Sequence, residues 1–316
     1  EFRRVLFRSI VVLSLLWGYT WVLAKQALSF SPPFTLTFIR VFGGAIALFL
    51  ALKILRQPLK LQATRAIVLI SLCQVAGFML LQTFSLKYGA AGKTAVLVYT
   101  MPIWTLLLAW PILGERVRGA QWLAVIGILA GLVLIIEPWH LQADWLSNSL
   151  GIGAAICWAM GTVLVKQLRG QSRVNLLSLT AWSNLIGSVP VGLIAAFADE
   201  PPVHWTPDFI GIMLVLTLIS TAFCWWLWTS ILDRVPAWEA SLLVLGTPVI
   251  AIISSRVILH EGFSEYEIAG ILQAKWQMGL NGAVLIANPV PANQGIVAEE
   301  MEVHIQKALS AAKEKK

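Results

Sequence analysis

The stretch WGYTWVLAK at residues 17–25 returns as WAMGTVLVK at residues 158–166, 141 positions later. A longer stretch, LKYGAAGKTAVLVYTMP at residues 86–102, aligns with LDRVPAWEASLLVLGTP at residues 232–248, 146 positions later. The second offset continues to ILGE at 112–115 and ILHE at 258–261, so that a Pro is followed by a Glu at the same spacing in both copies. Self-similarity at a fixed offset is the mark of a duplicated unit. The chain is therefore predicted to consist of two related halves.

The segments that carry the repeat are too apolar for a water-soluble domain. Of the 316 residues, 58% are hydrophobic and 12% are charged, and the mean hydropathy is +0.78. A soluble domain carries about 25% charged residues. The apolar residues fall in runs of roughly 20, the length that a helix needs to cross a bilayer. Ten spans are predicted, at residues 10–28, 34–55, 66–86, 93–113, 121–136, 150–168, 175–198, 208–232, 237–259 and 265–287.

Five spans per half is an odd number, so the second half must enter the membrane upside down relative to the first. The predicted fold is an all-α integral membrane protein with ten transmembrane helices in two inverted five-helix repeats, at residues 10–136 and 150–287. A polar cytoplasmic tail follows at residues 288–316. Inverted repeats are typical of secondary transporters, whose binding site lies near the midplane between the repeats. The alternative is an ancestral duplication that has no mechanistic meaning.

The distribution of basic residues predicts the orientation in the membrane. In a ten-span topology, 17 Lys and Arg residues fall on the side of the two termini and 4 on the other side. Basic loops stay in the cytoplasm, so both termini are predicted to be cytoplasmic and the protein to lie in the cell (inner) membrane. The net charge of +7 does not indicate nucleic acid, because the basic residues lie in short loops between apolar runs. Residues 1–9 (EFRRVLFRS) lack a signal-peptide cleavage site, and we expect a truncated start or a cloning or assembly junction.

The motifs of enzymes and ion-dependent proteins do not occur in the sequence. It contains no HExxH, no GxSxG and no phosphate-binding Gly-Lys loop, and its three Cys lie in apolar runs without a CxxC pattern. We therefore expect no enzymatic activity, no metal and no cofactor. A channel or a receptor-like membrane protein is the alternative to a transporter. Channels usually show a filter loop or a ring formed by symmetric subunits, and this sequence shows neither.

Several motifs together resemble the drug/metabolite transporter superfamily, specifically its EamA-type ten-helix members. They are WGYTWVLAK, FIRVFGGAIALFL at 38–50 and YTMPIWTLLLAWPILGERVRGAQWLAVIGILAGLVLI at 99–135, with ICWAMGTVLVKQL at 156–168 and LGTPVIAIISSRVILHEG at 245–262 in the second half. The resemblance covers residues 10–287. It implies a central cavity lined mainly by helices 1, 3, 4, 6, 8 and 9, alternating access, and export of amino acids, related metabolites or drugs.

The tenth span departs from this pattern. GILAGLVLI at 127–135 pairs with MGLNGAVLI at 278–286 only at an offset of 151, which leaves five extra residues, QAKWQ, at 273–277. A Lys in the middle of a span is costly if it faces lipid. Either Lys275 faces a partner or water, or the insertion is a sequence error.

Polar and aromatic side chains within the spans are the candidate binding residues. Trp17 and Trp158 occupy equivalent repeat positions and either form an aromatic wall or anchor their helices at the membrane interface. On the third span, Gln74, Phe78 and Gln82 are predicted to share one helical face, which either lines a wet cavity or bonds to a neighbouring helix. The predicted substrate-binding set, for a small zwitterionic or aromatic metabolite, is Trp17, Gln74, Phe78, Gln82, Tyr99, Trp158 and Trp228.

A second set of candidates concerns structure or energy coupling. A buried Arg40 needs carboxylate or carbonyl partners or an anionic substrate. Glu239 is the candidate for a proton-coupling carboxylate, and Pro102 and Pro248 are candidate bending points in equivalent spans.

The Glu residues that end the repeated Pro-to-Glu motif, Glu115 and Glu261, are predicted to cap neighbouring helices rather than to carry protons. Gly127 and Gly131 form a GxxxG motif that could serve a homodimer.

Overall fold

The computed structural model describes residues 2–115, 126, 130, 145–237, 240–241, 244 and 246–261, with side chains described from residue 8 onward. All regular elements of these residues are helical, and seven stretches are long and apolar enough to cross a membrane. The predicted fifth and tenth spans, the tail, Glu239 and the GxxxG glycines lie outside the described residues. The total of ten helices therefore stays a prediction. The seven stretches are Arg8–Ala27, Pro33–Ile54, Thr64–Tyr88, Ala91–Leu113, Trp145–Gln171, Leu176–Phe197 and Pro207–Leu232.

Four of these spans are continuous helices and three are divided. The continuous helices are α1 (Phe2–Ala27), α2 (Pro33–Ile54), α8 (Trp145–Gln171) and α9 (Leu176–Phe197). The divided spans consist of α3 (Thr64–Ile70), η1 (Ser71–Gly77) and α4 (Phe78–Tyr88); of α5 (Ala91–Val98) and α6 (Met101–Leu113); and of α10 (Pro207–Leu214), η3 (Val215–Phe223) and α11 (Cys224–Leu232). The shorter helix α13 (Gly246–Leu259) is the last that the structure describes.

The helices bury aliphatic, aromatic and small residues against one another, and many further large apolar side chains are exposed. Large exposed side chains include Leu50, Leu69, Leu193 and Val257. In water such a surface would be unfavourable, but it matches the hydrocarbon of a bilayer. The described chain is thus a multi-pass membrane protein.

Two π-helical segments occupy equivalent places in the two halves. The segment η1 divides the span that contains α3 and α4, and η3 divides the span that contains α10 and α11. Shifted by the repeat offset of 146, residues 71–77 fall on residues 217–223, inside η3. π turns are frequent at functional sites, and here each buries one side, with Gln74 and Val75 in η1 and Ser220 and Thr221 in η3.

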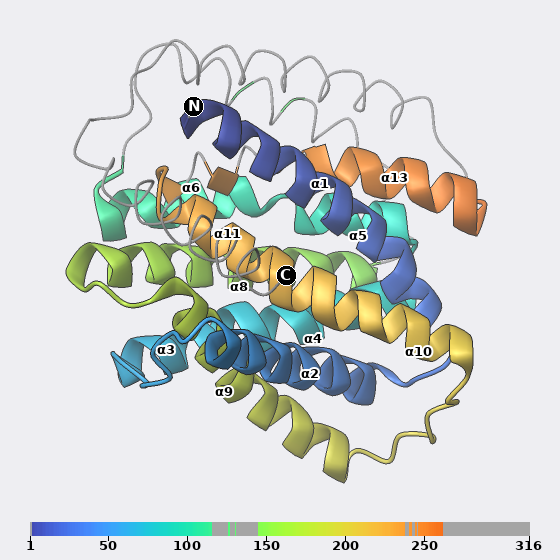
Figure 1. Ribbon diagram of the computed structural model, residues 1–316. Helices are drawn as coiled ribbons and strands as arrows, with labels where there is room; N and C mark the ends of the chain where they lie inside the picture. Colours follow the sequence, from blue (N-terminus) through green and yellow to red (C-terminus); the bar gives the residue numbers. More distant parts are fainter. Residues whose placement is uncertain are drawn as a thin grey trace, which may run out of the picture.

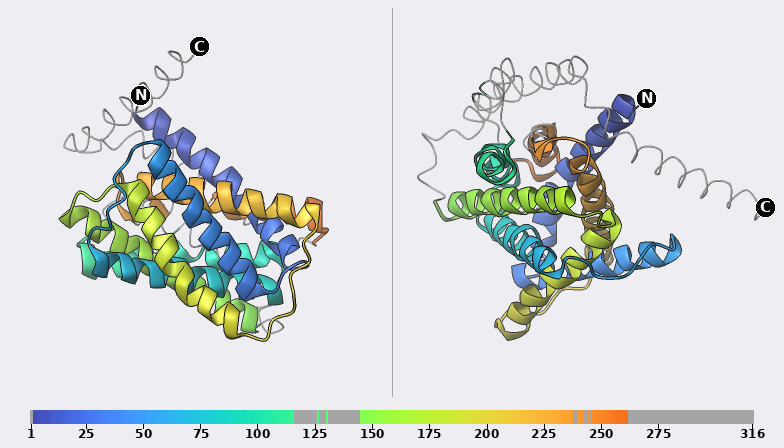
Figure 2. Two further views of the ribbon diagram at one scale, coloured as in Figure 1. Left: turned by 60° about the horizontal axis from the view of Figure 1, so that its bottom comes forward. Right: turned by 90° about the vertical axis from the view of Figure 1, so that its left-hand side faces the viewer.

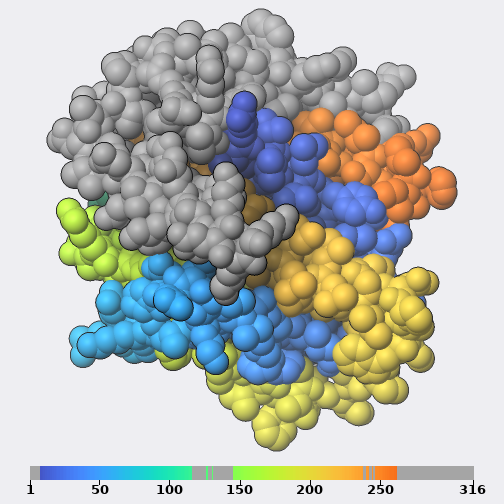
Figure 3. Space-filling view, in the orientation of Figure 1, coloured from blue at the N-terminus to red at the C-terminus, as the bar shows by residue number. Residues whose placement is uncertain are grey.

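Helices of the first half pack against helices of the second half. Helices α2 and α9 lie side by side, and α1 lies between α13 and the span that contains α10 and α11 (Figures 1, 2 and 3). Gly44 of α2 lies against Thr221 of η3, and Gly187 of α9 lies against Val75 of η1. Thr221 and Val75 are related by the offset of 146, so the two contacts lie at equivalent positions of the repeat.

Helices related by the repeat run in opposite directions. The carboxylate of Glu200, just after α9, accepts hydrogen bonds from the backbone N–H groups of Phe34 and Thr35 at the start of α2, at 3.0 and 2.9 Å. At the other end, Asn175 before α9 donates to Gln57 after α2, at 2.9 Å. The end of each helix thus contacts the start of the other.

Candidate functional site

An aromatic cluster lies where helices of the two halves meet. Trp158 of α8 is at its centre and is 2% exposed. Its ring centroid lies 5.4 Å from that of Trp17, 4.7 Å from that of Phe78, 5.6 Å from that of Trp225 and 5.5 Å from that of Trp228. These separations are typical of tilted and edge-to-face aromatic pairs. The cluster brings together α1, α4, α8 and α11, which are distant in sequence.

The π-helical segment η3 helps to position this cluster. The indole Nε1 of Trp17 donates a hydrogen bond to the backbone carbonyl of Ser220 at 3.2 Å. A π turn alters the helical hydrogen-bond pattern, and the carbonyl of Ser220 serves a side chain of another helix here. The ring of Trp17 is therefore held against the second half of the chain by a polar contact as well as by packing.

A small cavity opens beside the cluster, in which the centre of a water-sized sphere can occupy about 30 Å³. Of the seven predicted substrate-binding residues, five line it, and Arg40 lines it as well. Thr20, Trp21, Val98, Met101 and Trp225 complete the lining. The wall is mostly aromatic, with a few polar groups, as is common for small-molecule sites. The five predicted residues in the lining are Trp17, Phe78, Gln82, Tyr99 and Trp158.

The remaining two predicted binding residues lie behind this wall. Trp228 packs on Trp17 and Trp158 with centroid separations of 6.1 and 5.5 Å, but it does not line the cavity. Gln74 lies in η1 against Gly161 of α8. Its side chain packs there, and Gln74 does not line the cavity.

Some buried polar atoms that have no hydrogen-bond partner in the described part of the chain belong to the cavity wall. Those of residues in the cavity wall are Gln82 Oε1 and Trp158 Nε1. A buried polar group without a partner is unfavourable by about 1–3 kcal/mol. Such groups in a cavity wall are suited to a polar ligand.

Arg40 is the charged residue of this wall. It projects from α2 and is 6% exposed. Its Nε donates to Thr221 Oγ1 at 3.1 Å, and its Nη2 donates to Ser220 Oγ at 2.9 Å. Both hydroxyls belong to η3, so Arg40 ties the first half to the π-helical segment of the second.

A broken helix borders the cavity. The span 91–113 is interrupted between Val98 and Met101, and Pro102 follows in the first turn of α6. Because Pro has no N–H group, Pro102 cannot donate to the carbonyl of Val98. The predicted bend is thus a break, and Pro248 lies in the first turn of α13 in the other half.

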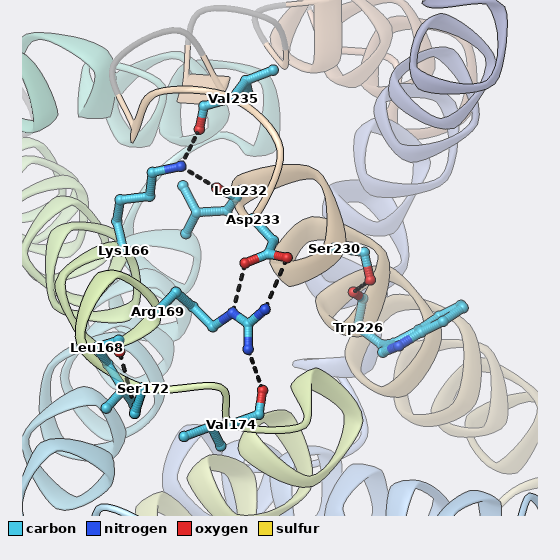
Figure 4. Close-up of polar contacts among 10 residues, drawn as sticks. All are labelled: Lys166, Leu168, Arg169, Ser172, Val174, Trp226, Ser230, Leu232, Asp233 and Val235. Carbon is cyan, nitrogen blue, oxygen red and sulfur yellow. Dashed lines mark hydrogen bonds and ion pairs between the residues drawn. The ribbon is translucent and has the colours of Figure 1, made fainter. Parts of the chain in front are cut away.

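Lysines and glutamates cap helix ends in equivalent pairs. Lys25 Nζ donates to the carbonyls of Leu86 and Gly89 at 2.5 and 2.7 Å. The equivalent Lys166 Nζ donates to the carbonyls of Leu232 and Val235 at 3.0 and 2.8 Å (Figure 4). Each lysine thus satisfies carbonyls at the carboxyl end of a helix in its own half.

The two glutamates of the Pro-to-Glu motif cap helices of the opposite half. Glu261 accepts hydrogen bonds from the N–H groups of Ala91 and Gly92 at 2.8 and 3.1 Å, at the start of α5. Glu115 accepts one from the N–H of Ala237 at 2.9 Å. The prediction that both glutamates cap neighbouring helices is confirmed.

One end of the bundle also carries an ion pair. Arg169 of α8 forms two contacts with Asp233, Nε to Oδ1 at 2.6 Å and Nη2 to Oδ2 at 3.0 Å, and it also donates to the carbonyl of Val174 (Figure 4). Beside it, burial lowers the pKa of Arg234, and the charge of Asp233 partly opposes that shift. The repeat places Leu28 and Lys87 at the corresponding positions, so the pair belongs to one half.

The family comparison matches both halves. The model described as "EamA-like transporter family" matches residues 8–137 and again residues 145–274. A second model, "Indigoidine synthase A like protein", matches residues 254–316. Among the described residues, no group of His, Cys, Asp and Glu is arranged to hold a metal ion.

Individual relatives carry transporter names. The "Uncharacterized transporter YoaV" of Bacillus subtilis is 31% identical over 83% of this chain and 91% of its own length. The "Probable amino-acid metabolite efflux pump" of Salmonella typhimurium is 27% identical over 80% of this chain and 87% of its own. A protein of the same description from Escherichia coli is 25% identical over 80% and 87%. A solved structure, 19% identical, shares the fold with a TM-score of 0.67 over 89% of this chain and 96% of its own.

Proposed function

The chain belongs to the EamA-like transporter family, and from this we propose that it is a secondary transporter that exports a small metabolite by alternating access. The observation that carries the proposal is the cavity beside the aromatic cluster, because its wall is built by helices of both halves. A carrier must expose one site to either side of the membrane in turn. A site between two halves is opened and closed when the halves move against each other.

The antiparallel pairing of equivalent helices supports an inverted ten-helix arrangement. Opposed contacts at both ends of α2 and α9, together with the exchanged caps of Glu115 and Glu261, are what two upside-down copies would form. We propose repeats at 10–136 and 150–287, with both termini and the tail at 288–316 in the cytoplasm. Pairing of two copies through Gly127 and Gly131 is part of the same proposal.

Amino acids and related compounds are the proposed substrates. Two relatives are named as probable amino-acid metabolite efflux pumps. A wall of indole and phenyl rings with a few polar groups suits a small solute that has a flat or apolar part. Coupling to protons is also proposed, with Glu239 as the carboxylate that exchanges them.

Transport by purified protein in proteoliposomes tests this function. A carrier gives saturable flux, and it accelerates exchange when unlabelled substrate is present on the opposite side. Flux that does not saturate and proceeds at channel rates would show a pore instead. Flux that does not respond to a pH gradient would remove proton coupling but leave the carrier proposal intact.

Variants of the cavity wall test the site. Trp17→Ala and Gln82→Ala should weaken binding of the transported metabolite, measured by the shift in melting temperature that the ligand produces. Trp145→Ala is the matched control, because Trp145 is 70% exposed and does not line the cavity. Unchanged affinity in both cavity variants would disprove the proposed site.

A further inference from the structure

Arg40 is a buried cation that no carboxylate neutralises. It is 6% exposed, and its hydrogen-bond partners are the neutral hydroxyls of Ser220 and Thr221. Among the described residues, no acidic side chain forms an ion pair with it. A charged group within a membrane span is costly, and such groups usually pair with one another or mark a substrate pathway. The position of Arg40 therefore calls for an anion that the described protein does not supply.

The hydrogen bonds of Arg40 leave one edge of its guanidinium available. A guanidinium has five N–H donors in a fixed planar fork. Nε donates to Thr221, and one N–H of Nη2 donates to Ser220. These two hydrogen bonds occupy the edge of the guanidinium that Nε and Nη2 share. The other edge, formed by Nη1 and the second N–H of Nη2, has no partner among the described residues. Two parallel N–H groups on such an edge match the two oxygens of a carboxylate.

The hydroxyls hold the guanidinium in a fixed direction. Thr221 Oγ1 donates its own proton to the carbonyl of Leu216 at 2.9 Å, and it therefore accepts from Arg40 rather than donating. The five-residue step from Leu216 to Thr221 follows the π-helical geometry of η3. The π segment thus positions Arg40 while it leaves the charge unneutralised.

The surroundings of this free edge define the ligand. Arg40 lines the cavity together with the rings of Trp17, Phe78 and Trp158. Among the described residues of the lining there is no Asp or Glu, and this part of the wall has one cationic pole and is otherwise aromatic, apolar or weakly polar. We propose that Arg40 binds the carboxylate of the solute through its free edge, while the aromatic or apolar part of the solute packs among the rings. This inference rests on the proposed transport function and narrows its substrates to aromatic or apolar carboxylates.

The competing interpretation is a purely structural role, in which Arg40 only joins α2 to η3. The two interpretations differ in their dependence on the charge of the ligand. A structural arginine would leave the affinities of a carboxylate and of its neutral amide alike. A binding arginine makes charge-assisted hydrogen bonds to the carboxylate alone, which corresponds to roughly tenfold or greater preference.

The test compares 3-phenylpropionate with 3-phenylpropanamide, which differ in the carboxylate and share the phenyl group. Dissociation constants are measured by quenching of tryptophan fluorescence, with purified full-length protein in detergent and no gradient. We expect wild-type protein to bind the carboxylate at least tenfold more tightly than the amide. Equal affinities, or no binding of either compound at millimolar concentration, would overturn the proposal. This comparison uses wild-type protein and does not depend on the folding of a variant.

Variants then assign the preference to Arg40. Arg40→Met should reduce the carboxylate preference to less than about twofold, and Arg40→Lys should retain part of it. Arg65→Met is the matched control, because Arg65 is an exposed arginine outside the cavity, and it should keep the wild-type preference. A preserved preference in Arg40→Met would contradict the proposal. Binding with the expected preference but without carrier flux would refute the transport function and leave this inference standing. Saturable flux without carboxylate preference would do the reverse.

Discussion

Replacing Asp233 by Ala should loosen one end of the helix bundle in a measurable way. Asp233 follows α11, and its carboxylate receives two N–H groups of Arg169 from the end of α8, at 2.6 and 3.0 Å. The same turn is held by Lys166, which donates to the carbonyls of Leu232 and Val235 (Figure 4). The ion pair therefore joins two helices that also build the aromatic cluster.

The burial of the pair sets the expected magnitude. The side chains of Arg169 and Asp233 are 16% and 9% exposed. Exposed ion pairs contribute about 0.2–1 kcal/mol, whereas removal of one partner of a fully buried pair is unfavourable by about 3–5 kcal/mol. This pair lies between these limits, and Arg169 keeps the carbonyl of Val174 as a partner. We expect Asp233→Ala to lower the free energy of unfolding by about 2 kcal/mol.

A double-mutant cycle isolates the interaction. Asp233→Ala, Arg169→Ala and the double variant are unfolded reversibly in mixed micelles, and helical circular dichroism gives the free energy of unfolding of each. The expected coupling energy is about 1.5 kcal/mol. Lys87→Ala is the control, because Lys87 holds the position that corresponds to Asp233 in the other half and lies over the rings of Phe84 and Tyr88. A coupling energy below about 0.5 kcal/mol would refute the reasoning, since that is the value of an exposed pair.

Three further predictions use the same unfolding assay. Gly161→Ala should destabilise the protein by about 1–3 kcal/mol, because a methyl group there would overlap the side chain of Gln74. Gly170→Ala has open space in the same helix and should be neutral or slightly stabilising; equal effects of the two glycine variants would contradict the close packing. Glu261→Gln should lower stability by about 1 kcal/mol, because it removes the charge that caps α5, and an unchanged value would show that the cap is dispensable. Trp158→Ala should lower stability by about 3 kcal/mol, since its ring contacts four others, and a loss below 1 kcal/mol would show that the cluster is loosely packed.

The repeat in the sequence pairs helix ends whose contacts the structure then shows to be alike. Lys25 donates to the carbonyls of Leu86 and Gly89. Lys166, 141 positions later, donates to the carbonyls that lie 146 positions after those two, at residues 232 and 235. Such contacts depend on backbone groups that every duplicated helix end possesses. They therefore follow from the alignment of the two copies and need no knowledge of the packing between them.

The composition of the cavity wall could be predicted only in part. Where almost every residue of a span is apolar, the sequence does not reveal a π turn, and Gln74 of η1 packs on Gly161 rather than lining the cavity. For the same reason Trp225 was missed, because it lies in the run WWLW at 225–228, where each helical face carries an apolar side chain. Two polar residues of the wall were recognisable in the sequence. Arg40 and Gln82 stood out against an apolar background, and both lie in the wall.

The break in the repeat near the end of the chain coincides with the limits of the family matches. The second EamA-like match ends at residue 274, inside the QAKWQ segment at 273–277, while the match to the other family extends to residue 316. After this segment the similarity between the halves continues only at the larger offset of 151, with MGLNGAVLI at 278–286.

The two halves share a frame but differ in the side chains that surround the cavity. The equivalent contacts of Gly44 and Gly187 place Ser183 of α9 where α2 has Arg40. Likewise, Trp228 stands where the first half has Gln82. Duplication can supply two similar states of similar free energy, but a site with identical walls would offer a polar solute no preferred orientation. The substitutions across the repeat put the cation on one side of the aromatic cluster, so a carboxylate would enter the cavity in one orientation in both states.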